Sequence, residues 1–220
     1  EAVPTPEEVD LECMYPNDFV GHRSGPAAGQ YFRVILDPSC TKIKSRFFKG
    51  CKFLIEIVIP QNSAVTRILF GAFSGCINLQ RITNGLPVGL VELGEDAFSD
   101  CGSLQQETLT IPRTVRKIGD QCFIWCKSLT LVVFKHQLPT DTIVLQPSMF
   151  SNCAELRAVT LPPTLSKIPT CCFGGCRSLT NIPIPTAVRV INRGAFKYCS
   201  ALRRVDLSKN ITAIHRDRGV

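Results

Sequence analysis

The chain has 220 residues, of which 45% are hydrophobic and 20% are charged, and its formal net charge is +7. This composition is typical of a folded globular protein and excludes an intrinsically disordered chain. No window approaches about 18 consecutive apolar residues, which excludes a transmembrane helix, and the charge is too small to indicate nucleic-acid binding.

Residues 1–37 form a lead-in that does not share the pattern of the rest of the chain. They contain Pro4, Pro6 and Pro16, which together with several glycines predict an extended structure rich in loops. The first ten residues are acidic and are unlike a secretory signal peptide. A strand is expected at 31–36, where it would cover an open sheet edge.

Residues 38–214 contain a repeat with a unit of 23 residues, and residues 215–220 form a short tail. The pattern Phe-x-x-Cys-x-x-Leu occurs seven times. A pattern that recurs at this spacing indicates a solenoid in which each copy is one coil, so seven coils and a partial eighth are expected. The Phe/Cys pairs are Phe48/Cys51, Phe73/Cys76, Phe98/Cys101, Phe123/Cys126, Phe150/Cys153, Phe173/Cys176 and Phe196/Cys199.

Each recurring position has a structural role. The pattern Leu-x-x-Val-x-Ile alternates apolar and variable residues, which predicts a strand with one buried face. Such strands, stacked at about 4.8 Å, form a parallel sheet, and the proline that follows ends each strand. We expect the phenylalanine to fill the space between the two sides of the coil.

The segment from Ile111 to Leu129 reads Ile-Pro-x-x-Val-x-x-Ile-Gly-x-x-Cys-Phe-x-x-Cys-x-x-Leu. This string and its period closely resemble the BspA-type leucine-rich repeat. The resemblance implies a curved ribbon that binds proteins, often as an adhesin on microbial or protist surfaces. The expected fold class is an α/β solenoid, a leucine-rich repeat ribbon with one short parallel strand per coil and returns made mostly of turns and short helices.

The cysteines are better explained as buried structural residues than as a metal-binding or redox site. Seven belong to the repeat, and Cys122 and Cys172 occupy the small position before phenylalanine. A soft-metal or redox site is the alternative, but the chain has no Cys-x-x-Cys pair and no histidine near these residues. We therefore expect buried thiols. A capping disulfide between Cys13 and Cys40 is a separate hypothesis.

Catalysis and cofactor binding have little support in the sequence. His22, His136 and His215 are isolated, and no glycine-rich phosphate-binding motif occurs. A solvated loop histidine is the favoured interpretation of His136. We expect no enzymatic activity, no cofactor, no metal and no small-molecule substrate.

The variable strand positions form the expected contact surface for a protein partner. Their side chains are charged toward the two ends and apolar or small in the middle coils, which is typical of a protein-binding patch. The alternative is that β-propensity alone explains these residues. Pro183 is unexpected, because a proline removes one ladder donor. The candidate residues are Val58, Thr83, Thr110, Leu131, Val133, Thr160, Pro183 and Arg204.

A second column of side chains is rich in basic residues. It is consistent with a ridge that binds polyanions, but a solvated outer face is the favoured interpretation. The column lacks the interleaved aromatic residues on which the bases of a single-stranded nucleic acid would stack. The basic column comprises Lys42, Arg67, Arg116, Lys117, Lys167 and Arg189.

Three functions follow from these patterns. The first is a protein-binding module for adhesion, on the cell surface or secreted, as the resemblance implies. The second is a scaffold subunit inside a cell or organelle, favoured by unpaired thiols and by a C-terminal edge that further repeats or another chain would cover. The third and weaker one is polyanion binding by the basic column. No membrane insertion is expected.

Overall fold

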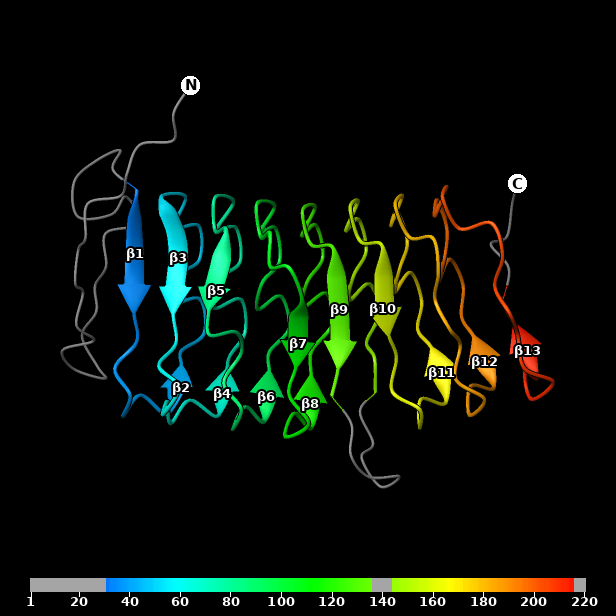
Figure 1. Ribbon diagram of the computed structural model, residues 1–220, viewed down its shortest axis with the longest axis horizontal. Coiled ribbons are helices and arrows are strands. Elements are labelled where there is room, and N and C mark those ends of the chain that lie inside the picture. Colours follow the sequence, from blue (N-terminus) through cyan, green and yellow to red (C-terminus); the bar gives the residue numbers. More distant parts are fainter. Residues whose placement is uncertain (1–30, 136–143, 216–220) are drawn as a thin grey trace.

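The computed structural model describes residues 31–135 and 144–215, which form a stack of about seven coils (Figure 1). Two series of short strands run along the stack, and in Figure 1 their arrows point in opposite directions. The first series is β1 (Phe32–Ile35), β3 (Leu54–Val58), β5 (Arg81–Thr83), β7 (Leu109–Ile111), β9 (Leu131–Phe134) and β10 (Ala158–Thr160). The second is β2 (Lys42–Ile43), β4 (Arg67–Ile68), β6 (Glu92–Leu93), β8 (Lys117–Ile118), β11 (Lys167–Ile168), β12 (Val190–Ile191) and β13 (Ala213–Ile214).

All strand pairs are parallel, and each joins equivalent positions of neighbouring coils. The first series forms the sheets β1-β3-β5 and β7-β9-β10, and the second forms β2-β4-β6-β8 and β11-β12-β13. One strand per coil was expected, and the structure adds a second, two-residue strand on most coils. The strand expected at 31–36 is present as β1, which pairs with β3 at the N-terminal end of the first sheet.

The phenylalanines of the repeat lie in the core, as predicted, and their rings form a continuous stack. Neighbouring rings from Phe48 to Phe196 have centroids 5.0 to 5.7 Å apart and lie within 16° of parallel. The rings of Phe98, Phe123 and Phe173 are at most 1% exposed. Because each interior ring contacts one ring above and one below, the stack couples neighbouring coils along its length.

From the second coil on, the ladder cysteine of each coil binds the preceding coil through its thiol. The Cys126 Sγ donates to the carbonyl oxygen of Phe98 at 3.1 Å, and the Cys153 Sγ donates to that of Phe123 at 3.2 Å. The same bond is made by Cys76, Cys101, Cys176 and Cys199. These six thiols are buried and free. A small side chain that buries well and still donates one weak hydrogen bond fits this position.

The expected helical returns are wrong: residues 31–135 and 144–215 contain no helix, so the α of the predicted class is not present there. The return is the segment that leads from a strand of the second series to the next coil and contains the phenylalanine. It contains two residues with positive φ, two positions before and two positions after the phenylalanine. Positive φ interrupts a right-handed helix. The amides bind the next coil instead, as when Phe73 N donates to Ala97 O at 2.8 Å.

The glycines that precede the ladder cysteines are explained by this geometry. Gly50, Gly75 and Gly175 have φ between 71° and 77°. Trp125 and Tyr198 occupy the same column with φ of 62° each, although bulky residues rarely adopt this conformation. The backbone is therefore strained at these two residues, and their side chains are exposed by 42% and 73% respectively.

Some expectations fall on residues outside the described ranges. Cys13, His22 and His136 are among them, so the Cys13–Cys40 disulfide stays a prediction. The boundaries at residues 37 and 214 also stay predictions. In the part of the chain that the structure describes, no helix is long and apolar enough to span a membrane.

Candidate functional site

The outward side chains of the first strand series form aligned columns, which together make the strand face. Thr110, Val133 and Thr160 are register partners in β7, β9 and β10, and Val58 is opposite Thr83. These columns are the ones that the repeat predicted. The pairing is interrupted between β5 and β7, where the Gln106 Oε1 accepts the Ile82 N–H at 3.1 Å.

The strand face is therefore divided into three groups of candidate residues. The first contains Val58 and Thr83. The second contains Thr110, Leu131, Val133 and Thr160, and the third contains Pro183 and Arg204 at the C-terminal end. The eight candidate residues of the strand face therefore do not form one continuous surface.

The middle group carries the apolar part of the face. Leu131 is 36% exposed, and its register partner Ala158 is half-buried, as is Val133. Thr110 and Thr160 flank Val133 on the two neighbouring strands. The result is a narrow apolar surface between threonines, held on three hydrogen-bonded strands.

A charged cluster lies beside the first group, on the same two strands, β3 and β5. Glu56 occupies an outward position, yet it is only 6% exposed. Arg81 covers it with two hydrogen bonds of 2.9 Å, from Nε to Oε1 and from Nη2 to Oε2, and Thr83 Oγ1 also donates to Oε1. The Arg81 guanidinium, aided by Thr83 and by the positive charge of Arg33, holds the pKa of Glu56 below its ordinary value. This carboxylate supports the face rather than presenting a free charge.

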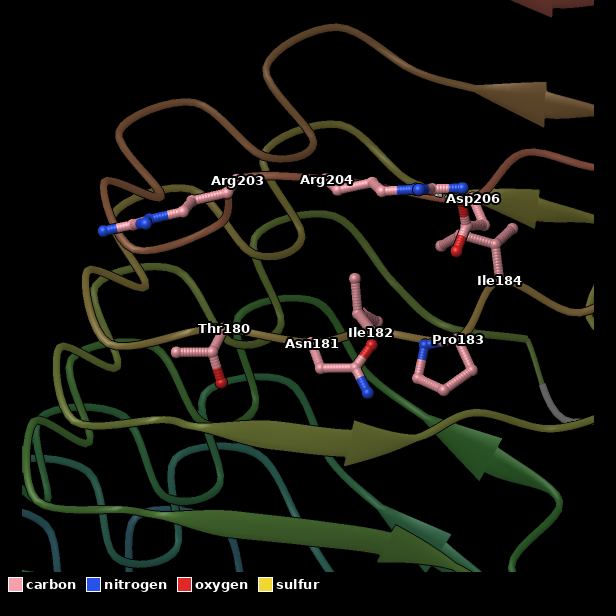
Figure 2. A pocket seen from close by; sticks show the side chains of 8 residues that line it. All are labelled: Thr180, Asn181, Ile182, Pro183, Ile184, Arg203, Arg204 and Asp206. Carbon is pink, nitrogen blue, oxygen red and sulfur yellow. Dashed lines mark hydrogen bonds and ion pairs between the residues drawn. The ribbon is translucent and has the colours of Figure 1, made fainter.

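The third group borders a cavity of about 460 Å³ (Figure 2). The strand ladder weakens here, because Asn181 makes only an isolated bridge to Ala158 and residues 203–207 form no strand. Pro183 has no N–H to donate, and the pairing of this coil with β10 is limited to the single bridge between Asn181 and Ala158. The cavity is lined by Thr180, Asn181, Ile182, Pro183, Ile184, Arg203, Arg204 and Asp206.

The basic column lies on the second strand series. Lys42, Arg67, Glu92 and Lys117 are consecutive register partners in β2, β4, β6 and β8. The Glu92 Oε1 lies 2.6 Å from the Lys117 Nζ and interrupts the positive charge. Arg116, Lys117, Lys167 and Arg189 are exposed, as are Lys42 and Arg67, but β8 and β11 belong to separate sheets. The column is thus two short basic groups.

The described residues offer little for catalysis or metal binding. Among residues 31–135 and 144–215, no group of three His, Cys, Asp or Glu side chains could hold a metal ion. Desolvation raises the pKa of the Cys126 and Cys153 thiols well above the ordinary value, and that of Cys199 to about 11. A buried thiol that stays protonated is a poor nucleophile.

Two features of the surface were not predicted. Arg203 lines the cavity, and the paired prolines Pro183 and Pro185 are the sequence signal that the ladder ends beside it. Trp125 and Tyr198 are the other feature, each with a lysine side chain over its ring. Their signal was a bulky aromatic in a column where other coils carry Gly, Asp or Asn.

Comparison with known proteins gives a consistent result. A family model described as BspA type Leucine rich repeat region matches residues 41–140 and 135–217, with six copies. Among solved structures, a leucine-rich repeat protein from Bacteroides ovatus is 27% identical, with a TM-score of 0.68 over 84% of this chain and 51% of that one. The chain thus spans about half the length of that protein.

A second solved structure is the T. pallidum leucine-rich repeat protein TpLRR. It is 31% identical to this chain, with a TM-score of 0.66, and the match covers 77% of each chain. No curated protein sequence matches the chain.

Proposed function

Since the chain belongs to the BspA-type leucine-rich repeat family, we propose that it is a non-enzymatic module that binds a partner protein on its strand face. The observation that carries this proposal is the apolar surface of Leu131, Val133 and Ala158 between polar groups. Such a surface on a rigid ladder provides a desolvated centre and a polar rim, the usual anatomy of a protein interface. Proteins of this repeat class generally bind proteins or occur at surfaces.

The proposed partner is a protein on a cell surface or outside the cell, so that the module serves in adhesion. An intracellular or organellar scaffold is the alternative. The free thiols do not favour the scaffold, because burial suppresses the thiolate form that oxidation requires, and buried thiols are compatible with either location. Antibody labelling of intact cells that produce the protein distinguishes the two: surface labelling supports adhesion, and labelling only after permeabilisation supports the scaffold.

The strand face is tested by Leu131→Asp combined with Val133→Asp. Placing two carboxylates in the apolar centre is expected to abolish binding to any partner that covers it. The matched control is Val88→Asp with Val91→Asp, since both valines are exposed outside the strands of the first series. Pull-down with both variants, after confirming equal folding by circular dichroism, gives the answer. Retention of every partner by Leu131→Asp/Val133→Asp contradicts the proposal.

Polyanion binding remains the weaker candidate. Its support is the exposed pair Lys42 and Arg67 on neighbouring coils, and Glu92 counts against it by neutralising Lys117. Elution from a heparin column at increasing salt tests it, because a binding column of bases predicts retention that falls steeply with salt. No retention at low salt rejects it.

A further inference from the structure

The cavity at the C-terminal end lies between two chain segments that a regular repeat would join. Residues 180–184 and 203–206 occupy equivalent places in successive coils, where β9 and β10 are paired in earlier coils. Backbone bonds connect the coils on either side of the gap, from Ala201 N to Arg177 O and from Thr212 N to Arg189 O. No backbone hydrogen bond joins residues 180–184 to residues 203–206, although the structure describes both segments.

The gap leaves residues 180–184, which are joined to β10 through the Ala158–Asn181 bridge, with an open edge on the side of the next coil. An open edge presents peptide groups that can pair with an added strand, and solenoid or sheet proteins usually cover it. Extended peptides bind such edges in a recurring mode in which main-chain bonds provide affinity and side-chain pockets provide specificity. Ile182 is buried and Ile184 half-buried beside the edge, so they form an apolar floor for alternate side chains.

The charge of the gap defines the chemistry of its occupant. The cavity between residues 180–184 and 203–206 is called the slot below, and residues 203–206 form one of its walls. Arg203 and Arg204 extend in opposite directions from this wall, so they cover both ends of the slot (Figure 2). Arg204 pairs with Asp206 at 2.6 Å, but both side chains are about four-fifths exposed, so a competing carboxylate can replace Asp206. Arg203 makes no ion pair with a described residue. The wall therefore carries two guanidinium groups against one carboxylate.

We propose that this slot binds an extended, acidic segment of a partner protein, which adds as a strand to the open edge of residues 180–184. Its carboxylates pair with Arg203 and Arg204, and its apolar side chains pack on Ile182 and Ile184. The inference rests on the proposed protein-binding function and names the partner chemistry at one end of the same face. Asp206 shields Arg204 until the segment binds.

The test uses a fluorescein-labelled octapeptide of alternating Val and Glu, with fluorescence anisotropy as the readout. An octapeptide of alternating Val and Lys is the charge control, and a backbone N-methylated Val/Glu peptide is the control for strand addition. Arg203→Glu/Arg204→Glu is expected to weaken binding of the Val/Glu peptide at least about tenfold. Arg113→Glu/Arg116→Glu is the matched variant, since it changes the net charge equally at exposed arginines outside the slot.

Several results overturn the inference. These are absence of binding to the wild-type protein, equal weakening by both double variants, and undiminished binding of the N-methylated peptide. Displacement by a heparin hexasaccharide that depends equally on both arginine pairs likewise overturns it, in favour of general polyanion binding. Leu131→Asp/Val133→Asp is expected to keep peptide binding, because its substitutions lie outside the cavity lining. Failure of the slot is thus distinguished from failure of the strand-face proposal.

Discussion

The stack of phenylalanines makes a quantitative prediction for Phe123→Ala. Phe123 is fully buried, and its ring lies between those of Phe98 at 5.4 Å and Phe150 at 5.7 Å. Removing a buried phenylalanine typically costs about 3–5 kcal/mol, and the loss of two stacked neighbours places this site at the upper end, near 5 kcal/mol. The substitution also cuts the stack in its middle, so both adjoining coils lose a contact.

Phe196→Ala is the matched control at the end of the stack. Phe196 is half-buried and stacks on Phe173 alone among the described rings. Half the burial and one neighbour predict a loss of about 2 kcal/mol. The two variants thus make the same chemical change at an interior and a terminal position.

Urea unfolding measures the difference. Trp125 is the only tryptophan of the chain and lies two residues from Phe123, so its fluorescence reports on the middle coils. Equal destabilisation by the two variants, or a loss below about 2 kcal/mol for Phe123→Ala, would refute the reasoning. Either result would mean that coils are stabilised locally and not by neighbour contacts through the stack.

Three further predictions follow from single sites. Glu56→Gln is expected to reduce the acid sensitivity of stability: the pKa of Glu56 is lowered in the folded state by Arg81, so its contribution is present above the ordinary Glu pKa and is lost as pH falls through the lowered value. Urea midpoints at neutral and acidic pH measure this effect. Tyr198→Gly is expected to raise the free energy of unfolding by about 1 kcal/mol, because glycine adopts the positive φ without strain. With a thiol-reactive disulfide reagent near neutral pH, the half-buried Cys171 is expected to react in the folded protein, whereas Cys126 reacts only after unfolding.

The controls for these predictions come from the same coils. Lys197→Gly, one residue before the strained position, gains no relief of positive φ and is expected to destabilise the protein, so a similar gain at both sites contradicts the strain argument. Cys171→Ala should remove one fast-reacting thiol, and an unchanged fast phase contradicts the assignment. For Glu56→Gln, a pH dependence that matches the wild type shows that other groups dominate.

The inward-facing half of the fold could be predicted because the same pattern of buried residues occurs seven times in the sequence. Phe123 and Cys126 recur in register with their counterparts, so a single period fixes their burial and their contact with neighbouring coils. The sequence did not predict the conformation of the returns. Positive φ at Trp125 and Asp100 is imposed by bonds to neighbouring coils, whereas local propensity would allow a short helix.

For the outward-facing side chains, the sequence predicted the positions but not the burial of each side chain. The repeat located Glu56 and Arg81 at equivalent sites, and the opposite charges of register partners could have predicted their pairing. Burial of Glu56 depends further on Thr83 and on packing across the coils, which no local pattern contains. Exposure at Leu131 could be predicted because its strand face has no covering layer.

Departures from the repeat mark the surfaces where a function can develop. Inward positions are constrained by every neighbouring coil, so a change there weakens the whole stack. Pro183 breaks the pattern at an outward position, where the pairing with the preceding coil is already reduced to the bridge between Asn181 and Ala158. Residues 180–184 are not paired with residues 203–206 of the next coil, and the cavity beside Arg203 and Arg204 lies between these two segments. A binding slot therefore arises where the repeat stops enforcing strand pairing, and the regular coils provide the rigid support that holds it in shape.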